Sequence, residues 1–124
     1  MDHIAVCANT EEQADRFFGE LLGLQRERVF TVPAGMMLAL FGIGREIRVL
    51  RYGRGGTDVE VFITGDDSRS ADPFTHSCLV VPDREAFCNR AEAMGLAVAR
   101  VTKASGQGTV AFVSDFYGNR YEIK

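Results

Sequence analysis

Residues 3–8 read HIAVCA and residues 76–81 read HSCLVV, two short apolar runs that each open with a histidine. Apolar runs of this length, bounded by polar residues, are typical of β-strands. Each run leads into a helical pattern that ends at a Gly-Leu pair, and the distance from histidine to leucine is 21 positions (His3 to Leu24) or 20 positions (His76 to Leu96). This repetition predicts two copies of one strand–helix unit.

The two helical segments carry recognisable start and stop signals. Thr10 opens the capping-box pattern TEEQ of the first helix, and Asp83 is the expected N-cap of the second. Gly23 and Gly95 are the expected C-terminal stops. Apolar residues fall at helical spacing between these signals: Ala14, Phe17, Phe18, Leu21 and Leu22 in the first copy, and Phe87, Ala91 and Met94 in the second.

After each helix the pattern becomes strand-like, which predicts strands over 25–32, 46–52, 58–63, 97–102, 109–114 and 120–124. The segment 33–44, which contains MMLALF, fits a short helix, an irregular loop or a further strand. The polar segment 65–73 is the predicted linker. These elements give an α+β fold of two tandem βαβββ modules, 1–64 and 74–124, expected to form a single domain over residues 1–124 because neither module has a comfortable core alone.

Composition limits the classes of function. The chain has 124 residues, 14 Lys+Arg against 17 Asp+Glu and a net charge of −3, so no basic footprint for nucleic acid is expected. No apolar stretch approaches the ~20 residues of a membrane span, and the opening residues carry no apolar or basic leader pattern. The three cysteines form no C-x-x-C pair, which favours a reduced, cytoplasmic protein with no membrane partner.

Side-chain alternation separates polar from aliphatic residues in four of these strands. Aliphatic side chains form one face that suits packing against helices, and a histidine or glutamate lies on the other face. Small residues beside the histidines would leave room for a cavity: Ala5, Cys7 and Cys78. Two histidines and two glutamates on one face suit a divalent metal, which would also neutralise the carboxylates: His3, Glu60, His76 and Glu122.

With these features the sequence resembles the vicinal oxygen chelate superfamily, which includes glyoxalase I, extradiol dioxygenases and the fosfomycin- and bleomycin-resistance proteins. The most specific pieces are HIAV at 3–6, FFGELLGL at 17–24 and DFYGNRYE at 115–122, in which Phe116 replaces the usual proline. The resemblance implies a curved, bowl-like mixed sheet with helices outside. It also implies metal ligands in the first and last strands of each module, which by position are His3, Glu60, His76 and Glu122.

The His/Glu/His/Glu set is most similar to that of glyoxalase I. This implies one divalent metal ion (Zn or Ni, with Co, Mn or Fe as other options), a small-molecule substrate and a homodimer. It also implies lyase or isomerase chemistry, in which two neighbouring substrate oxygens are chelated and Glu122, as general base, moves a proton next to a carbonyl. Two alternatives stay open: a metal-free binding module of the bleomycin-resistance type, and an iron-dependent dioxygenase.

Plainer interpretations apply to single residues. His3 fits a solvated terminal residue, and Glu122 fits a tail carboxylate beside basic neighbours. A two-residue turn at 55–56 would place Glu60 opposite Arg51 as a cross-strand ion pair, whereas a loop one residue longer would place it opposite Leu50. Four further residues are candidates for lining a substrate pocket: Arg48, Tyr52, Phe62 and Cys78.

Overall fold

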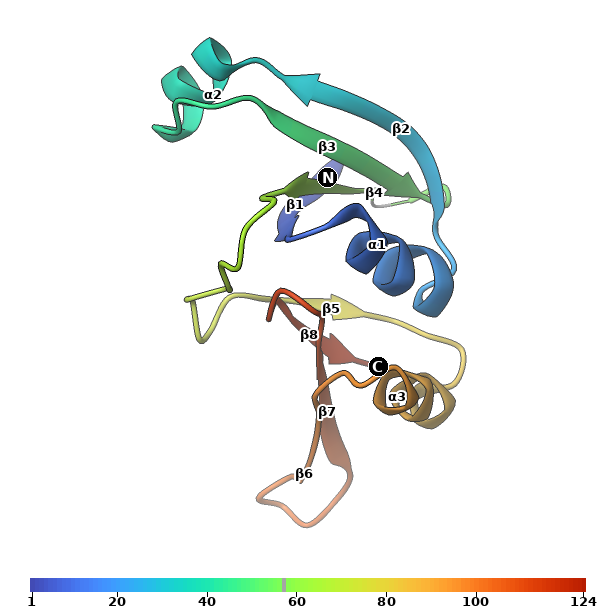
Figure 1. Cartoon of the computed structure of the whole chain (residues 1–124). Helices are drawn as coiled ribbons and strands as arrows, with labels where there is room; N and C mark the ends of the chain where they lie inside the picture. Colours follow the sequence, from blue (N-terminus) through green and yellow to red (C-terminus); the bar gives the residue numbers. More distant parts are fainter. Residues whose placement is uncertain (57) are drawn as a thin grey trace. The chain divides into compact units, whose positions relative to one another are not determined.

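The computed structural model describes residues 1–56 and 58–124, which form two compact units, 1–68 and 69–124. The first unit contains β1 (His3–Ala8), α1 (Glu11–Ala14), η1 (Asp15–Leu21), β2 (Gln25–Val32), α2 (Ala34–Phe41), β3 (Ile47–Gly53) and β4 (Asp58–Ile63) (Figure 1). The second contains β5 (His76–Leu79), α3 (Arg84–Ala93), β6 (Val98–Thr102), β7 (Thr109–Ser114) and β8 (Arg120–Ile123). The boundary between the units falls inside the predicted linker.

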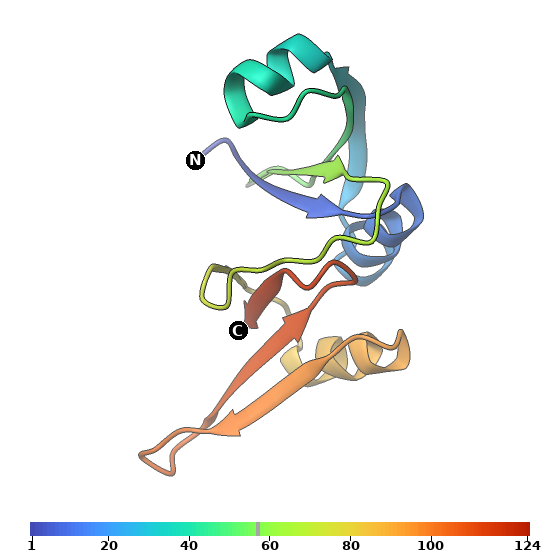
Figure 2. The same ribbon diagram turned by 60° about the vertical axis from the view of Figure 1, so that its left-hand side comes forward.

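Each unit carries one four-stranded mixed sheet with the same topology. The strand orders are β1-β4-β3-β2 and β5-β8-β7-β6, and the first strand of each unit pairs in parallel with its last strand. The remaining pairings are antiparallel. The predicted α+β fold of two tandem βαβββ modules is confirmed, with α2 as an additional helix between β2 and β3 (Figure 2).

The first helix begins as predicted and then changes its winding. The Thr10 hydroxyl accepts the Gln13 N–H at 3.2 Å, as an N-cap does. From Asp15 the segment is a π-helix, and the Leu22 N–H reaches the Phe17 carbonyl five residues back. Three apolar side chains of this segment are buried, which fixes it on the first unit: Phe17, Phe18 and Leu21.

The segment 33–44 contains a helix, α2, which follows Pro33 and ends at Gly42. Gly42 has a φ of 71°, a left-handed conformation that glycine adopts at little cost. Met37 is the buried residue of α2 and packs in a cluster with Ile47 and Val49 of β3. These two strand residues share the face of β3 that also carries Arg51, so α2 covers part of the face opposite to α1 and η1.

The second unit is organised around α3. Asp83 caps this helix by accepting the Ala86 N–H at 2.9 Å, and Gly95 follows its end with a φ of 81°. The core of the unit is formed by side chains that are essentially solvent-free: Phe87, Cys88, Ala91, Ala111, Val113, Tyr121 and Ile123. Over the described part of the chain, no helix has both the length and the apolar character needed to span a bilayer.

Candidate functional site

The predicted alternation of faces holds in both units. Val59 and Val61 of β4 are buried, as are Tyr121 and Ile123 of β8, while the glutamate between each pair is partly exposed. In the first unit Ala5 of β1 pairs with Glu60, and in the second Cys78 of β5 pairs with Glu122. Each histidine therefore stands two residues before the partner of its glutamate, and the two modules hold His and Glu at equivalent positions.

In the first unit the histidine and the glutamate face each other. His3 Nε2 lies 3.4 Å from Glu60 Oε2, and the two side chains are 38% and 14% exposed. His3 Nδ1 donates to Asp2 Oδ2 at 2.9 Å. Because an ionised carboxylate only accepts, Nδ1 carries a proton, and in a neutral ring Nε2 turns a lone pair toward the Glu60 carboxylate. A metal ion bound by both groups would remove the repulsion between this lone pair and the carboxylate.

Arg51 joins this pair into a closed ring of side chains. Its guanidinium lies 3.4 Å from Glu60 Oε1 and 3.0 Å from Asp2 Oδ2, and it also contacts Asp58 Oδ2 at 2.8 Å. His3, Asp2, Arg51 and Glu60 thus form the "Arg51 ring", to which Asp58 is attached. Hydrogen bonds to His3 and Arg51 lower the pKa of Asp2, and those to Asp58 and Asp2 raise the pKa of Arg51.

The register of β3 and β4 decides between the two partners predicted for Glu60, Arg51 and Leu50. Arg51 pairs with Glu60 across β3 and β4, and Leu50 pairs with Val61. The register of the ion-pair interpretation is therefore the one observed. The ion pair lies in a partly buried network, since the side chains of Arg51 and Glu60 are 21% and 14% exposed.

In the second unit Nδ1 of the histidine also has a hydrogen-bond acceptor, but the neighbouring side chains differ. His76 Nδ1 donates to the Phe74 carbonyl at 2.8 Å, which leaves Nε2 as the acceptor of a neutral ring. The His76 and Phe112 rings lie in a T-shaped arrangement, with the ring centroids 5.1 Å apart. Phe112 pairs with Glu122 as Arg51 pairs with Glu60, so a phenyl ring occupies in this module the position of the guanidinium in the first.

Glu122 has a weaker partner than Glu60. Its Oε1 lies 3.4 Å from the Nζ of Lys124, whose side chain is 62% exposed. Among the residues that the structure describes, no ion pair joins His76 to Glu122, and no group of three or more His, Cys, Asp or Glu side chains is placed to hold a metal ion. Each unit thus carries one histidine and one glutamate of the four predicted ligands, at equivalent strand positions.

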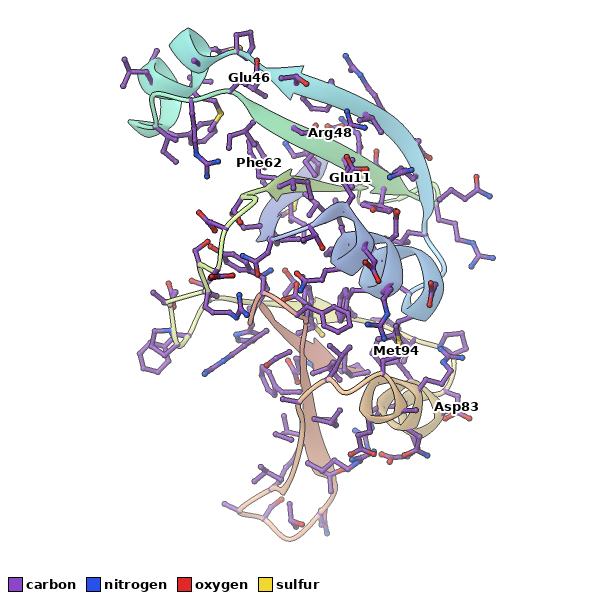
Figure 3. All side chains as sticks on the ribbon, viewed as in Figure 1. Glu11, Glu46, Arg48, Phe62, Asp83 and Met94 are labelled. Atoms are coloured by element: carbon purple, nitrogen blue, oxygen red, sulfur yellow. The ribbon has the colours of Figure 1, made fainter. Side chains whose placement is uncertain are left out.

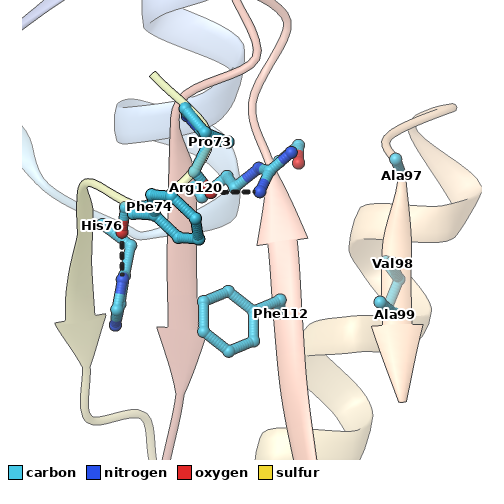
Figure 4. A pocket seen from close by; sticks show the side chains of 9 residues that line it. Pro73, Phe74, His76, Ala97, Val98, Ala99, Phe112 and Arg120 are labelled. Carbon is cyan, nitrogen blue, oxygen red and sulfur yellow. Dashed lines mark hydrogen bonds between the residues drawn. The ribbon is translucent and has the colours of Figure 1, made fainter. Parts of the chain in front are cut away.

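A cavity lies beside each histidine-bearing strand. In the second unit a cavity of about 480 Å³ is lined by His76, Phe74, Phe112 and Arg120, together with apolar residues of β6 (Figure 4). The Arg120 guanidinium donates to the Pro73 carbonyl and, within the described residues, forms no ion pair with a carboxylate. This cavity therefore combines an apolar wall with one histidine and one cation.

In the first unit a smaller cavity of about 230 Å³ is almost entirely apolar. Ala5, Cys7 and Phe62 line it from the sheet, and Met37 and Phe41 line it from α2. Small residues on the histidine face thus leave space in this unit, as expected, and Phe62 lies on that space. Cys78, the counterpart of Ala5, is exposed on β5.

Arg48 and Tyr52 lie on the opposite face of β3, toward α1 and η1. Tyr52 is 1% exposed, and its hydroxyl donates to Asp15 Oδ1 at 2.7 Å. Arg48 forms an ion pair with Glu11, and the two labelled side chains meet in Figure 3. Burial raises the pKa of Tyr52, as does its hydrogen bond to Asp15. The structure therefore uses both residues to attach the helix to the sheet and does not bring them to the face that carries His3.

Two residues of the Arg51 ring network were not anticipated from the sequence. Asp58 shares the parity of Glu60 within β4, and this alternation is the signal that would have found it. Asp2 precedes the first strand residue, where alternation gives no information, so only the folded structure shows that it contacts His3 and Arg51.

The donor chemistry of these residues fits a divalent metal, with one exception. Metal-binding histidines in proteins are commonly oriented by a carboxylate or a backbone carbonyl on the nitrogen that does not bind the metal. Asp2 and the Phe74 carbonyl serve His3 and His76 in this way. The exception is Arg51, which places a fixed positive charge against the carboxylate of Glu60.

Comparison with known proteins identifies the class to which this fold and this pattern of residues belong. The family model described as Glyoxalase/Bleomycin resistance protein/Dioxygenase superfamily matches residues 1–123, and the chain belongs to this superfamily. No curated protein sequence matches the chain significantly.

Solved structures show the same fold at low sequence identity. A glyoxalase family protein from Enterococcus faecalis has a TM-score of 0.73 at 19% identity, with 99% of this chain and 94% of that chain covered. The trypanothione-dependent glyoxalase I of Leishmania major gives 0.69 at 16% identity, covering 99% and 84%. A mutant of the fosfomycin resistance protein FosX from Listeria monocytogenes, in complex with Mn(II) and a dihydroxypropylphosphonic acid, gives 0.72 at 13% identity, covering 99% and 86%.

Proposed function

We propose that this protein is a metal-dependent lyase or isomerase that moves a proton next to a carbonyl group of a small oxygenated substrate. His3, Glu60, His76 and Glu122 would hold one divalent metal ion per chain, with Zn or Ni as the first candidates. When bound, such an ion supplies Lewis-acid polarisation of two neighbouring substrate oxygens. The homodimer, which the family resemblance implies, and the cytoplasmic location, which the cysteine pattern favours, stay predictions.

One observation carries the proposal: in both units an acceptor on Nδ1 leaves Nε2 of the histidine available, and a glutamate stands at the same strand position relative to it. A solvated terminal histidine has no need of a fixed tautomer, nor of a counterpart in the second module. The match to FosX adds support, because that relative was solved with Mn(II).

The surroundings of the two glutamates support Glu122 rather than Glu60 as the general base. Glu60 is held between His3 and the guanidinium of Arg51. Glu122 contacts only a flexible, solvated ammonium in the described ion pairs, and exposed pairs of this kind contribute little energy. This weak partner supports the role of general base that the family resemblance implies for Glu122. The cavity beside His76 offers the substrate an apolar wall, and Arg120 offers a positive charge for an anionic group.

A second candidate function is favoured by the Arg51 ring. A partly buried carboxylate without a metal needs another positive partner, and Arg51 already supplies one to Glu60. The protein would then bind a small molecule without converting it, which is the bleomycin-resistance alternative predicted from the sequence. Metal content separates the two candidates.

The test is elemental analysis of protein prepared without an affinity tag or chelator, followed by titration with Zn, Ni, Co, Mn and Fe(II) under anaerobic conditions. We expect about one equivalent of metal per chain and its loss in both H3A and H76A, because each histidine supplies one ligand. Small 2-oxo and 2-hydroxy carbonyl compounds serve as test substrates in deuterated water. The wild type should incorporate deuterium at the carbon next to the carbonyl group, and the E122Q variant should not.

Glu46→Gln is the matched control, since Glu46 is exposed and lies outside both pairs. This variant should keep the metal and the exchange activity. Wild-type protein that takes up none of the five metals would rule out the enzyme and leave the binding module. Oxygen consumption dependent on Fe(II) would instead indicate the dioxygenase.

A further inference from the structure

The two modules of this chain present their carboxylates to a metal unequally, and the difference lies in one residue of β3. Arg51 and Phe112 occupy equivalent positions, each paired across the sheet with the glutamate of its module. Arg51 contacts Glu60, Asp2 and Asp58, whereas Phe112 contacts the His76 ring and carries no charge. The first module thus has an internal cation at a place where the second has none.

We propose that Arg51 is a built-in counter-ion that competes with a divalent metal for Glu60 and so sets the metal affinity of this chain. The inference rests on the metal site proposed above. It leaves His76 and Glu122 without a competing guanidinium, and it makes Glu60 a ligand that becomes available only when the guanidinium of Arg51 moves away.

Geometry supports competition for the carboxylate. The two oxygens of Glu60 are directed to different partners, Oε1 to Arg51 and Oε2 to His3, so a metal that took both oxygens would break the contact with the guanidinium. Moving Arg51 away is costly because its guanidinium also binds Asp58 at 2.8 Å and Asp2 at 3.0 Å. The planar, permanently charged guanidinium suits such multiple contacts better than a lysine ammonium would.

Charge acts in the same direction as geometry. Three carboxylates surround the single guanidinium, and its removal leaves them mutually repelling within a partly buried site. A divalent ion would relieve that repulsion. A charge at hydrogen-bond distance changes the proton affinity of a carboxylate by about 10- to 1,000-fold, and we expect a metal ion to respond in the same sense.

The experiment is calorimetric titration of the full chain with Zn, Ni and Mn, together with thermal unfolding with and without metal. Arg51→Met should bind metal at least about tenfold more tightly than wild type, because the competing charge is gone. Without metal this variant should melt at a lower temperature than wild type, and metal should raise its melting temperature by a larger increment.

Two control variants isolate the role of the charge. Arg51→Lys keeps a positive charge but makes fewer contacts, so its metal affinity should lie between those of the wild type and Arg51→Met. Arg48→Met removes an arginine from the same strand on the opposite face, where it pairs with Glu11, and should leave the metal affinity unchanged. If Arg51→Met does not fold, Glu60→Gln and Glu122→Gln in the wild-type background decide: the inference requires that the first costs much less metal affinity than the second.

The outcomes distinguish this inference from the proposed function. If the wild type binds metal and Arg51→Met binds it equally or more weakly, the inference is wrong and the proposed metal enzyme stands. Wild-type protein that binds no metal while Arg51→Met binds one supports the inference and overturns the metal enzyme. If neither protein binds metal, both proposals are wrong.

Discussion

Asp115 shows how one side chain shapes the end of the candidate ligand strand β8. It is 8% exposed, and its Oδ1 accepts the backbone N–H groups of Tyr117, Gly118 and Asn119 at 2.9 to 3.0 Å. Its Oδ2 accepts the Asn119 side-chain amide at 2.7 Å and the Tyr121 hydroxyl at 3.1 Å. Burial raises the pKa of Asp115, and the hydrogen bonds from Asn119 oppose that shift. The carboxylate therefore fixes the turn that leads to Glu122.

Asp115→Ala should lower the free energy of unfolding by about 2–4 kcal/mol, because several buried donors lose their acceptor at once. Urea unfolding followed by circular dichroism measures the change. Asp72→Ala is the control, since Asp72 accepts comparable turn hydrogen bonds from Phe74 and Thr75 in an exposed segment. A loss in Asp115→Ala no greater than in the control would contradict the structural role assigned here.

At the scale of elements, local signals account for where the helices begin and end. Asp83 occupies the N-cap of α3, and Gly95 follows its last turn with a positive φ. α3 has ten residues, which is too short for a helix to be stable in isolation, so both its cap and its buried face matter. Phe87, Cys88 and Ala91 supply that face.

Asp83→Ala should destabilise the protein by about 1 kcal/mol, the usual cost of losing an N-cap acceptor. Asp83→Asn keeps a side-chain oxygen at the same place and should stay close to wild type. The comparison is made by thermal or urea unfolding of both variants. Equal losses in the two variants would mean that charge, rather than the hydrogen bond to the Ala86 N–H, is the source of stability.

At the scale of the whole chain, two carboxylates stabilise turns in the segment 65–73, which follows the last strand of the first unit in the sequence. The Ser68 hydroxyl and N–H hold the pKa of Asp66 down to about 2, and the Thr75 N–H and hydroxyl hold that of Asp72 down to about 2. The unfolded value is about 3.9, so both groups stabilise the folded state above that pH. This stabilisation is lost as the pH falls from about 4 to about 2, where the folded carboxylates take up protons.

The double variant D66N/D72N should therefore lose less stability than wild type between pH 4 and pH 2. Urea midpoints across this interval measure the effect. E46Q, which removes an exposed carboxylate outside this segment, should retain the wild-type slope. An unchanged slope in the double variant would show that other groups control the acid transition.

The arrangement of elements was largely predictable because local patterns encode it. Strand periodicity, the caps Thr10 and Asp83, and the stops Gly23 and Gly95 predicted the strands and helices of both modules, with strand bounds within about two residues of those observed. The segment 33–44 was ambiguous for a physical reason. An apolar run such as MMLALF suits a helix or a strand, and only the contact of Met37 with Ile47 and Val49 decides between them.

The sequence by itself determined the two modules, the face on which each histidine and glutamate lies, and the membership of a superfamily that the family model confirms. Only the tertiary structure decided how those residues are partnered. The Arg51 ring joins side chains from the N-terminus, β1, β3 and β4, and it depends on the β3–β4 register and on the parallel pairing of β1 with β4. Alternation along a strand fixes the direction of a side chain, but its cross-strand neighbour depends on hairpin geometry and chain closure, which a local pattern does not contain.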